Sequence, residues 1–338
     1  MTIDKEFIQS YMKNHKMHYP SGIIPVTQYS ESEQERYASL SLEILKQNFN
    51  GKTSIFIPGN QFTSLSVTGS SCDLNCEHCH THYLNHMEDV SSEEKLRSSL
   101  DALIEKGALG CLVSGGCDSQ GKVPLLRYSN ILKEYTEKSS LIFNFHVGLI
   151  NEEEIGKLAE IQPDFVSFDL TLDSDAIRDV YHLNKSVDDY IATYKSLIEH
   201  GIRTIPHICI GLNFGDIKKE EAILHEIAKY PVDLIVFLVI IPPPDHPTFH
   251  NANVDDVGNL FTTARLLFPQ TELSLGCMRP RDSERYQIEE LAVRAGFNRY
   301  EIPSKKTLKL MKNHGLSMHT YNVCCAVSNY QLDKLSKP

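Results

Sequence analysis

Residues 64–79 read SLSVTGSSCDLNCEHC, a short run that leads directly into three closely spaced cysteines. The run 64–71 predicts a β-strand. The segment 93–106 predicts a helix, because its leucines and isoleucine recur at helical spacing. The cysteines therefore lie in the loop after the first predicted strand.

The same alternation of strand and helix continues along the chain. Further strands are predicted at 110–116, 141–148, 165–172, 203–212, 234–241, 272–277 and 299–302. Helices are predicted between and after them, at 125–138, 152–161, 187–200, 218–230, 254–268, 286–295 and 305–314. This alternation is typical of parallel strands joined by crossover helices, and the number of pairs predicts a closed (β/α)8 barrel of the TIM type. An open doubly wound sheet is the alternative, but it usually carries a GxGxxG turn, and none occurs here.

The remaining segments flank this predicted barrel. Residues 1–63 form an N-terminal extension with one predicted helix at 31–48, the barrel occupies residues 64–315, and residues 316–338 form a C-terminal tail. Neither flanking segment is large enough to predict an independent domain.

Composition and charge argue against several classes of protein. The 338 residues carry a formal net charge of −11, which argues against a nucleic-acid partner because phosphate binding needs a cationic surface. The longest apolar run, 234–241, is far shorter than the roughly 20 residues that a membrane span needs. The amino terminus MTIDKEFIQS has no basic segment followed by an apolar one, so we expect no secretory signal and a cytoplasmic protein. In such a protein, the nine cysteines favour metal ligation or catalysis over disulfides.

The cysteine triplet consists of Cys72, Cys76 and Cys79, in the spacing CxxxCxxC. Three thiolates on one loop can bind three irons of a [4Fe–4S] cluster, which leaves the fourth iron open to a substrate or cofactor. A zinc site is the alternative, because histidines stand close by at positions 78, 80, 82 and 86. The position after the first strand favours the cluster, since active sites of such barrels lie at the carboxyl ends of the strands.

On this triplet the chain resembles the radical S-adenosylmethionine superfamily. In that family the open iron is chelated by the amino and carboxylate groups of S-adenosylmethionine. One electron from the reduced cluster then yields a 5′-deoxyadenosyl radical, which abstracts hydrogen from an unactivated carbon. The residue before the last cysteine is usually an aromatic that packs near the adenine, and here it is His78.

The resemblance extends to the end of the second predicted strand, Ser114-Gly115-Gly116-Cys117. It is similar to the family's GGE element, whose backbone approaches the methionine part of the cofactor. Glycine suits this approach because it has no Cβ. Cys117 stands where the family has glutamate, and a plain turn is the alternative interpretation.

Three more residues are similar to cofactor contacts of related enzymes. Asp169 and Thr171, in the fourth predicted strand, match polar contacts to the ribose. Arg178, just beyond, can pair with the cofactor carboxylate. A helix cap or a surface ion pair is the alternative for each of them.

The other cysteines fall into two groups. Cys111 and Cys209 lie within apolar strands and are predicted to be buried core thiols. The second group stands at strand ends or in the tail, and comprises Cys117, Cys277, Cys324 and Cys325. Because the strand ends of a barrel meet at its catalytic mouth, and the tail can fold over that mouth, this group predicts a second iron–sulfur cluster. Adjacent cysteines project in different directions, so one of the last pair can be a ligand without the other, and unrelated buried thiols are the alternative.

Across residues 55–327 the arrangement resembles the biotin synthase and lipoyl synthase branch. The SGGC and GCMRPR segments and the Cys324–Cys325 pair look most like a subunit of the two-component lipoyl synthases. The resemblance implies sulfur insertion into a protein-bound octanoyl chain, with the auxiliary cluster as sulfur donor. It also implies three partners: an octanoylated carrier protein, a second radical S-adenosylmethionine subunit and a low-potential electron donor such as ferredoxin. The alternatives are a cofactor maturase or rearrangement enzyme of the same branch, and a non-catalytic iron–sulfur or zinc protein.

Two further expectations concern the substrate. Phe143, Phe145 and Phe168 are candidates for an apolar lining around an alkyl chain, with ordinary core packing as the alternative. Arg279 and Arg281, beside Cys277, could hold an anionic substrate or cluster ligand, with a solvated loop as the alternative.

Overall fold

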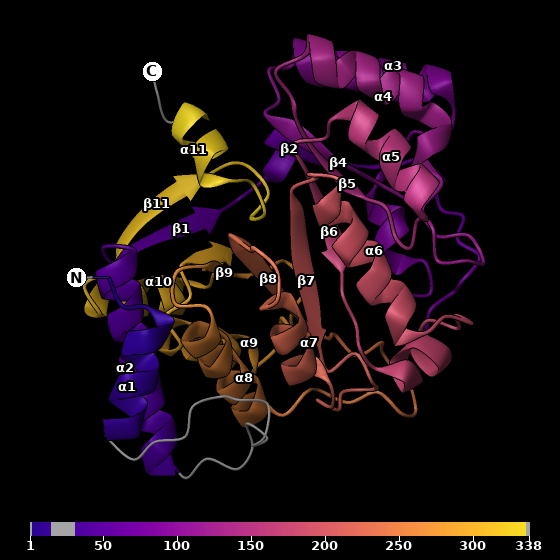
Figure 1. Cartoon of the computed structure of the whole chain (residues 1–338). Helices are drawn as coiled ribbons and strands as arrows, with labels where there is room; N and C mark the ends of the chain where they lie inside the picture. Colours follow the sequence, from indigo (N-terminus) through magenta and orange to yellow (C-terminus); the bar gives the residue numbers. More distant parts are fainter. Residues whose placement is uncertain (1, 15–30, 336–338) are drawn as a thin grey trace. The chain divides into compact units, whose positions relative to one another are not determined.

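The computed structural model describes residues 2–14 and 31–335, and the elements can be followed by their labels in Figure 1. The chain divides into two compact units. Unit 1 comprises Met1–Phe56 with Ile208–Thr320, and unit 2 comprises Ile57–His207 with Tyr321–Pro338. The division falls within strand β7 (Thr204–Ile210).

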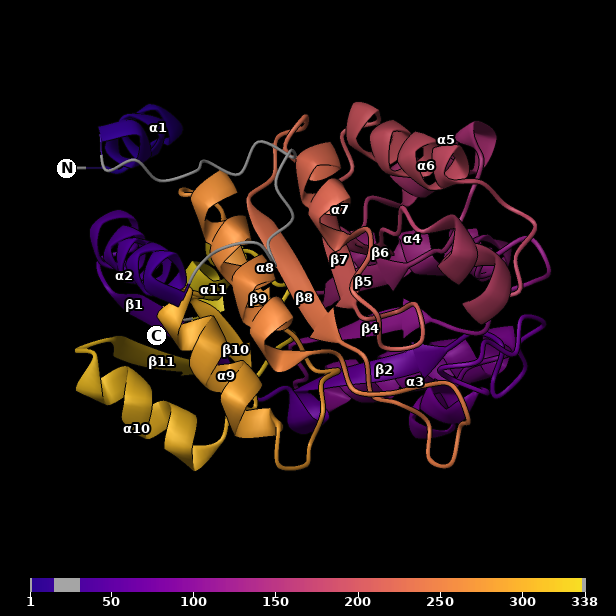
Figure 2. The same ribbon diagram turned by 90° about the horizontal axis from the view of Figure 1, so that it is seen from below.

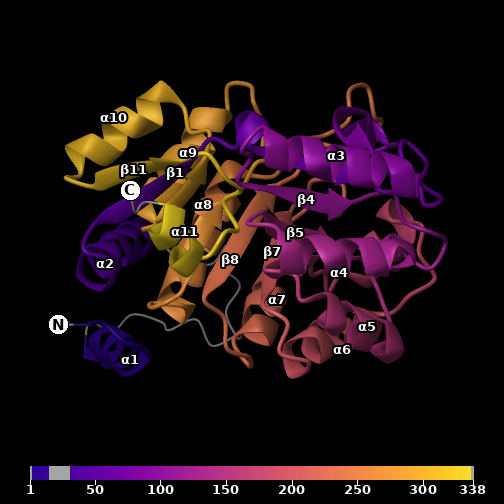
Figure 3. The same ribbon diagram turned by 90° about the horizontal axis from the view of Figure 1, so that it is seen from above.

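Unit 2 is built from parallel strands and the helices that follow them. Its strands are β2 (Phe62–Ser66), β3 (Glu88–Asp89), β4 (Gly110–Ser114), β5 (Ile142–His146) and β6 (Phe165–Asp169), with the first part of β7. The hydrogen-bonded order is β7-β6-β5-β4-β2-β3, and every printed pairing among them is parallel. The helices of this unit are α3 (Glu93–Glu105), α4 (Ser129–Lys138), α5 (Glu152–Ile161), α6 (Val187–Glu199) and α11 (Asn329–Leu335). Helices α3 to α6 pack side by side and cover one face of these strands (Figure 3).

Unit 1 repeats this alternation. Its strands are β1 (Lys52–Phe56), β8 (Leu234–Val239), β9 (Glu272–Leu275), β10 (Arg299–Glu301) and β11 (Ser317–Tyr321), in the order β11-β1-β10-β9-β8. Its helices are α1 (Lys5–Asn14), α2 (Glu31–Asn48), α7 (Glu220–Ile227), α8 (Val254–Leu267), α9 (Arg285–Arg294) and α10 (Lys305–Asn313). Helix α8 packs against α7 and α9, and α10 packs against α9, as Figure 2 shows.

The predicted alternation of parallel strands and helices is confirmed, and each strand and helix named above for residues 64–315 is present. Closure into an eight-stranded barrel stays a prediction. The sequence prediction missed α1, β1, β3, β11 and α11. Strand β1 pairs in parallel with β10, with Ser54 opposite Arg299, so the sheet contains a strand that precedes the first one predicted.

The flanking segments do not form bodies of their own. Helix α2 of the predicted N-terminal extension packs against α8 and α9 in unit 1. The predicted tail is divided between the units, because β11 joins the strands of unit 1 and the residues from Tyr321 onward belong to unit 2. There Gln331 Nε2 donates to Asp164 Oδ1 at 2.6 Å and Arg203 donates to the carbonyl of Ala326 at 3.5 Å. The compact units therefore follow other boundaries than 63 and 315.

The alternation of side chains along β5 decides which residues face the site. Asn144 and His146 point to the face that carries the cavity described below. Phe143 and Phe145 point to the helix-covered face, where they are fully buried with their ring centroids 6.0 Å apart. The prediction that these two phenylalanines line a substrate channel is therefore wrong, because the period of two along a strand sends them to the opposite face.

In the part of the chain that the structure describes, no helix combines the length and the apolar character that crossing a membrane requires.

Candidate functional site

A cavity of about 340 Å³ lies in unit 2, beyond the carboxyl ends of β4, β5 and β6. Four thiols line it, from Cys72, Cys76, Cys79 and Cys117. Its other polar lining includes Ser114, His78, His146 and Asp169, and much of the rest is leucine, valine, methionine and aromatic side chains. Most of the residues predicted for the cofactor site therefore line one cavity, and its wall is largely apolar.

The cysteine loop is wound tightly and anchored on two sides. Cys79 N and His80 N both donate to the carbonyl of Cys76, at 3.0 and 2.9 Å. Asp73 N donates to the carbonyl of Cys117 at 2.8 Å, which ties the loop to the end of β4. Glu77 N donates to the carbonyl of Val180 at 2.9 Å, which ties it to the π-helix η5 (Ala176–Val180). Such single-turn π-helices occur frequently at functional sites.

The triplet thiols suit a cationic iron cluster. Burial, reinforced by the neighbouring Cys72 and Cys79, raises the pKa of Cys76 to about 12. A buried thiol of this kind ionises when a metal compensates its charge, so the donor set fits iron. In the described ranges, no three His, Cys, Asp or Glu side chains converge closely enough to hold a single metal ion. A cluster does not require such convergence, because each thiolate binds a different iron.

The fourth thiol, Cys117, belongs to the same cavity. Burial is the main cause that raises its pKa, followed by the charges of Cys72 and Cys76. The residue predicted for an auxiliary cluster thus lies beside the triplet.

At the two glycines of the SGGC segment, the neighbouring atoms leave little room for a side chain. A Cβ at Gly116 would lie 2.0 Å from the carbonyl oxygen of Ser71 and 2.6 Å from the Cβ of Cys72. A Cβ at Gly115 would lie 3.0 Å from Thr68 Oγ1, which accepts a hydrogen bond from Gly116 N at 2.7 Å. The backbone of β4 therefore approaches the cysteine loop more closely than any side chain would allow.

His78 lines the cavity with an unsatisfied nitrogen. Its Nδ1 is buried and has no hydrogen-bond partner among the described residues. Its ring lies 5.6 Å from that of Tyr181, tilted by 59°. Burial lowers the pKa of His78 to about 4, so the imidazole is neutral near pH 7 and can donate to or accept from a bound molecule.

Asp169, at the end of β6, forms an ion pair with His146, at the end of β5, with Nε2 and Oδ2 3.1 Å apart. Burial alone would raise the pKa of Asp169, but His146, His207 and His78 outweigh it and lower the pKa to about 2. Burial would lower the pKa of His146, but Asp169 outweighs it and raises the pKa. His146 was not predicted, although a polar residue at the end of the apolar run FNFHVG is a signal that could have found it.

The other two predicted cofactor residues do not line the cavity. Thr171 is buried, and its Oγ1 accepts from Asp173 N at 3.3 Å in a local turn. Arg178 is mostly exposed and pairs with Asp175 at 2.9 Å and with Asp179. Arg178 thus forms a surface ion pair, which was its alternative interpretation, and its pairing with the cofactor carboxylate stays a prediction.

The remaining cysteines are distributed over both units. Cys324 lies against the middle of β5 in unit 2, where its Sγ accepts from Asn144 Nδ2 at 4.0 Å and from Ala326 N at 3.5 Å. The tail therefore meets the strand well before its carboxyl end. Cys325 is buried, and Cys277 is an exposed residue of unit 1 after β9. A second cluster stays a prediction.

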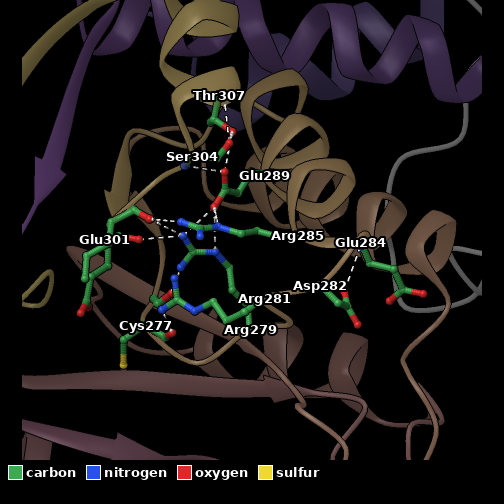
Figure 4. A network of polar contacts seen from close by, with 12 residues as sticks. Cys277, Arg279, Arg281, Asp282, Glu284, Arg285, Glu289, Glu301, Ser304 and Thr307 are labelled. Carbon is green, nitrogen blue, oxygen red and sulfur yellow. Dashed lines mark hydrogen bonds and ion pairs between the residues drawn. The ribbon is translucent and has the colours of Figure 1, made fainter.

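Arg279 is the centre of a buried network in unit 1 (Figure 4). Its guanidinium donates to Glu289 Oε1 at 2.8 Å, to the carbonyl of Gly276 at 2.6 Å and to that of Glu301 at 2.7 Å. The prediction that Arg279 holds an anionic substrate is therefore wrong, because Glu289 is its anion. Arg281 donates to the carbonyl of Cys277 at 2.9 Å and so braces the same loop.

Comparison with known proteins shows which family model and which solved structures this chain resembles. Residues 66–230 match the family model described as the Radical SAM superfamily. The fold is similar to that of methylornithine synthase, at 14% identity and a TM-score of 0.60, over 94% of this chain and 95% of that one. It is also similar to the FeFe-hydrogenase maturase HydG from Carboxydothermus hydrogenoformans, at 13% identity and a TM-score of 0.65, over 93% of this chain and 79% of that one. A search of curated protein sequences finds no relative.

Proposed function

Since residues 66–230 belong to the radical S-adenosylmethionine superfamily, we propose that this chain binds a [4Fe–4S] cluster and cleaves S-adenosylmethionine reductively. Cys72, Cys76 and Cys79 would hold the cluster. The observation that carries the proposal is that one cavity of unit 2 is lined by these three thiols, by the SGGC segment and by Asp169.

When bound and reduced, the cluster supplies the electron that splits the sulfonium into methionine and a 5′-deoxyadenosyl radical, which takes a hydrogen atom from an unactivated carbon. The chain's own residues hold and shield the reactants. Gly115 and Gly116 let the backbone of β4 approach the methionine moiety without a Cβ. The apolar wall of the cavity encloses the reactants and so limits side reactions of the radical with molecules other than the substrate.

The finer proposal is sulfur insertion of the lipoyl synthase type. It is supported by the resemblance of the SGGC and GCMRPR segments and of the Cys324–Cys325 pair. The environment of Cys324 adds to this support, because N–H groups directed at sulfur stabilise the thiolate of an iron–sulfur cluster. Cys277, Cys324 and Cys325, with Cys117, would then hold a second cluster that donates sulfur. The substrate would be an octanoyl group on a carrier protein, with a second radical S-adenosylmethionine subunit and a ferredoxin-like electron donor as partners.

A second candidate is a maturase or rearrangement activity that uses one cluster. Two of the structural neighbours are a hydrogenase maturase and a methylornithine synthase, and at their low identity to this chain the likeness shows only the fold. The specific observation in its favour is Cys117, which lies in the cavity of the triplet and so leaves fewer thiols for a separate cluster.

The two candidates are separated by one experiment. The protein is reconstituted anaerobically, its iron and acid-labile sulfide are counted, and it is incubated with dithionite, S-adenosylmethionine and an octanoylated peptide. Sulfur insertion predicts more iron than one cluster holds and a gain of sulfur in the peptide mass. Formation of 5′-deoxyadenosine with an unchanged peptide would contradict sulfur insertion into this substrate and retain only the cleavage reaction.

The variant Cys324→Ala sharpens this experiment, with Cys111→Ala as its matched control. Cys111 is fully buried and does not line the cavity. Under the finer proposal, Cys324→Ala loses part of the iron and all sulfur insertion but keeps the cleavage of S-adenosylmethionine. Cys111→Ala keeps all three. Equal iron in the two variants would contradict a second cluster at Cys324.

A further inference from the structure

His146 and Asp169 face the cavity from adjacent strands. His146 stands opposite Ser167 in the register of β5 and β6, so Asp169 lies two residues further toward the carboxyl end of β6. Asp169 in turn stands opposite His207 of β7. The three side chains form a histidine–carboxylate–histidine row across neighbouring strand ends, and His146 and Asp169 line the cavity.

The two histidines of this row differ in protonation. His207 Nδ1 lies 3.0 Å from the carbonyl oxygen of Ile205, so that nitrogen carries a proton and donates. Burial lowers the pKa of His207, which leaves it neutral. His146 is the partner within hydrogen-bonding distance of the carboxylate, at 3.1 Å. The charged group of the row is thus the His146–Asp169 ion pair.

This ion pair is incomplete on the carboxylate side. His146 occupies Oδ2, and Oδ1 of Asp169 makes no hydrogen bond with a described residue. The side chain of Asp169 is 43% exposed, and the surface it exposes belongs to the cavity. A carboxylate oxygen in a largely apolar cavity is a strong acceptor for the hydroxyl groups of a bound molecule.

We propose that His146 is a positioning residue for the nucleoside part of S-adenosylmethionine. It fixes Oδ2 of Asp169 so that Oδ1 accepts from the ribose hydroxyls. The inference rests on the proposed function, because it takes the nucleoside to occupy this cavity. His146 acts through Asp169 and touches neither the cluster nor the bond that breaks.

The test compares two nucleosides that differ only in the groups that Asp169 would bind. Adenosine carries both ribose hydroxyls and 2′,3′-dideoxyadenosine carries neither. Their affinities are measured by calorimetry on the reconstituted full-length protein, alongside that of S-adenosylmethionine. The wild type is expected to bind adenosine roughly 10- to 100-fold more tightly than the dideoxynucleoside, as a hydrogen bond to a charged group implies.

Three variants locate the source of this preference. His146→Leu removes the donor and is expected to reduce the ratio of the two affinities to about 3-fold or less, as is Asp169→Asn, which removes the charge. His146→Gln is expected to restore most of the ratio, because its amide nitrogen reaches the place of Nε2. A merely structural role would weaken both nucleosides equally. The ratio is also insensitive to the fraction of protein that folds.

The outcomes separate this inference from the function on which it rests. A wild type that binds neither nucleoside nor S-adenosylmethionine overturns the proposed function, and the inference with it. A wild type that cleaves S-adenosylmethionine, paired with a His146→Leu variant that keeps the full preference for adenosine, overturns the role of His146 alone. Failure of His146→Gln to restore the preference also counts against it.

Discussion

Two carboxylates of this protein, Glu289 in unit 1 and Asp169 in unit 2, differ in how completely their oxygens are hydrogen-bonded. In unit 1, Glu289 accepts from Arg279 and Arg285 through Oε1, and from Ser304 and Thr307 through Oε2. Both carboxylate oxygens are occupied and the side chain has no exposed surface (Figure 4). In unit 2, Asp169 has one imidazole partner and a carboxylate oxygen that faces a cavity.

This difference separates the polar groups that hold the fold from those that are available to a ligand. A buried carboxylate whose two oxygens both accept hydrogen bonds stabilises the fold, because removing it would leave its cationic partners buried without an anion. Asp169 has one carboxylate oxygen without a partner, and His78 Nδ1 in the same cavity also has none among the described residues. Both atoms can therefore form hydrogen bonds with a bound molecule. The following experiments test this distinction.

The largest effect is expected at the cysteine triplet. Cys79→Ala removes a thiol of the cavity and is expected to abolish the production of 5′-deoxyadenosine, because two thiolates do not hold the cluster for the cofactor. The reduced protein is incubated with S-adenosylmethionine and the nucleoside is quantified. The control Cys111→Ala is expected to cost about 1–2 kcal/mol in the free energy of unfolding and to keep the activity. Equal activity in both variants would contradict the assignment of the site.

The next effect concerns the structural cluster. Glu289→Ala leaves two arginines without their anion in a buried place and is expected to lower the free energy of unfolding by about 3–5 kcal/mol. Urea denaturation measures it. Glu153→Ala is the control, since Glu153 is mostly exposed and also pairs with a cation four residues away, at 2.7 Å from Lys157. That pair is expected to contribute less than about 1 kcal/mol. Similar losses in the two variants would refute the distinction.

The pH dependence follows from the same carboxylate. Burial would raise the pKa of Glu289, but Thr307, Arg279 and the backbone of Ser304 outweigh it and lower the pKa from 4.5 to about 2. A depressed folded-state pKa gives stability that is present above pH 4.5 and is lost as the pH falls toward 2. The difference in unfolding free energy between wild type and Glu289→Gln should therefore shrink between pH 6 and pH 2, by about 3 kcal/mol. A difference that stays constant with pH would show that Glu289 is not the ionised partner.

The close approach of β4 to the cysteine loop predicts a smaller effect. Gly116→Ala places a methyl group against the carbonyl of Ser71, so the loop must shift, and we expect a loss of about 1–3 kcal/mol in unfolding free energy together with reduced iron content. Gly156→Ala is the control, because it lies in helix α5 with no atom near the new Cβ, and it is expected to stabilise by roughly 0.5–1 kcal/mol. Full iron binding by Gly116→Ala would show that the loop has room.

The smallest effect is expected at Arg178. Because its guanidinium is 64% exposed and pairs with two surface carboxylates, Arg178→Gln should change the KM for S-adenosylmethionine by less than about 2-fold. Steady-state kinetics measure this. A tenfold increase in KM would instead support the cofactor contact that the sequence suggested.

Local rules predicted the elements well. Helix α5 begins and ends as predicted, at Glu152 and Ile161, and a capping box between Asn151 and Glu154 fixes its start. Strand β1 was missed because it lies in the N-terminal extension, before the regular alternation of strands and helices begins, and it is held by pairing with β10, far away in the sequence. Tertiary pairing, which local patterns do not contain, decides such strands.

The sequence predicted those parts of the site whose residues form short motifs. The triplet and the SGGC segment lie in one cavity because the carboxyl ends of parallel strands meet at the same edge. The partnership of His146 with Asp169 could not be predicted, because it depends on the register of two strands. The structural role of Arg279 was missed for a similar reason, since its anion Glu289 stands on another element and the charged motif alone suggested exposure.

The central claim is that three thiolates leave one iron open to S-adenosylmethionine. The most direct measurement is electron–nuclear double resonance on the reduced, reconstituted protein with S-adenosylmethionine that carries an isotope label in its amino nitrogen. The account predicts a hyperfine coupling between the labelled nitrogen and the cluster. A bound cluster whose spectrum shows no coupling to the label would contradict it.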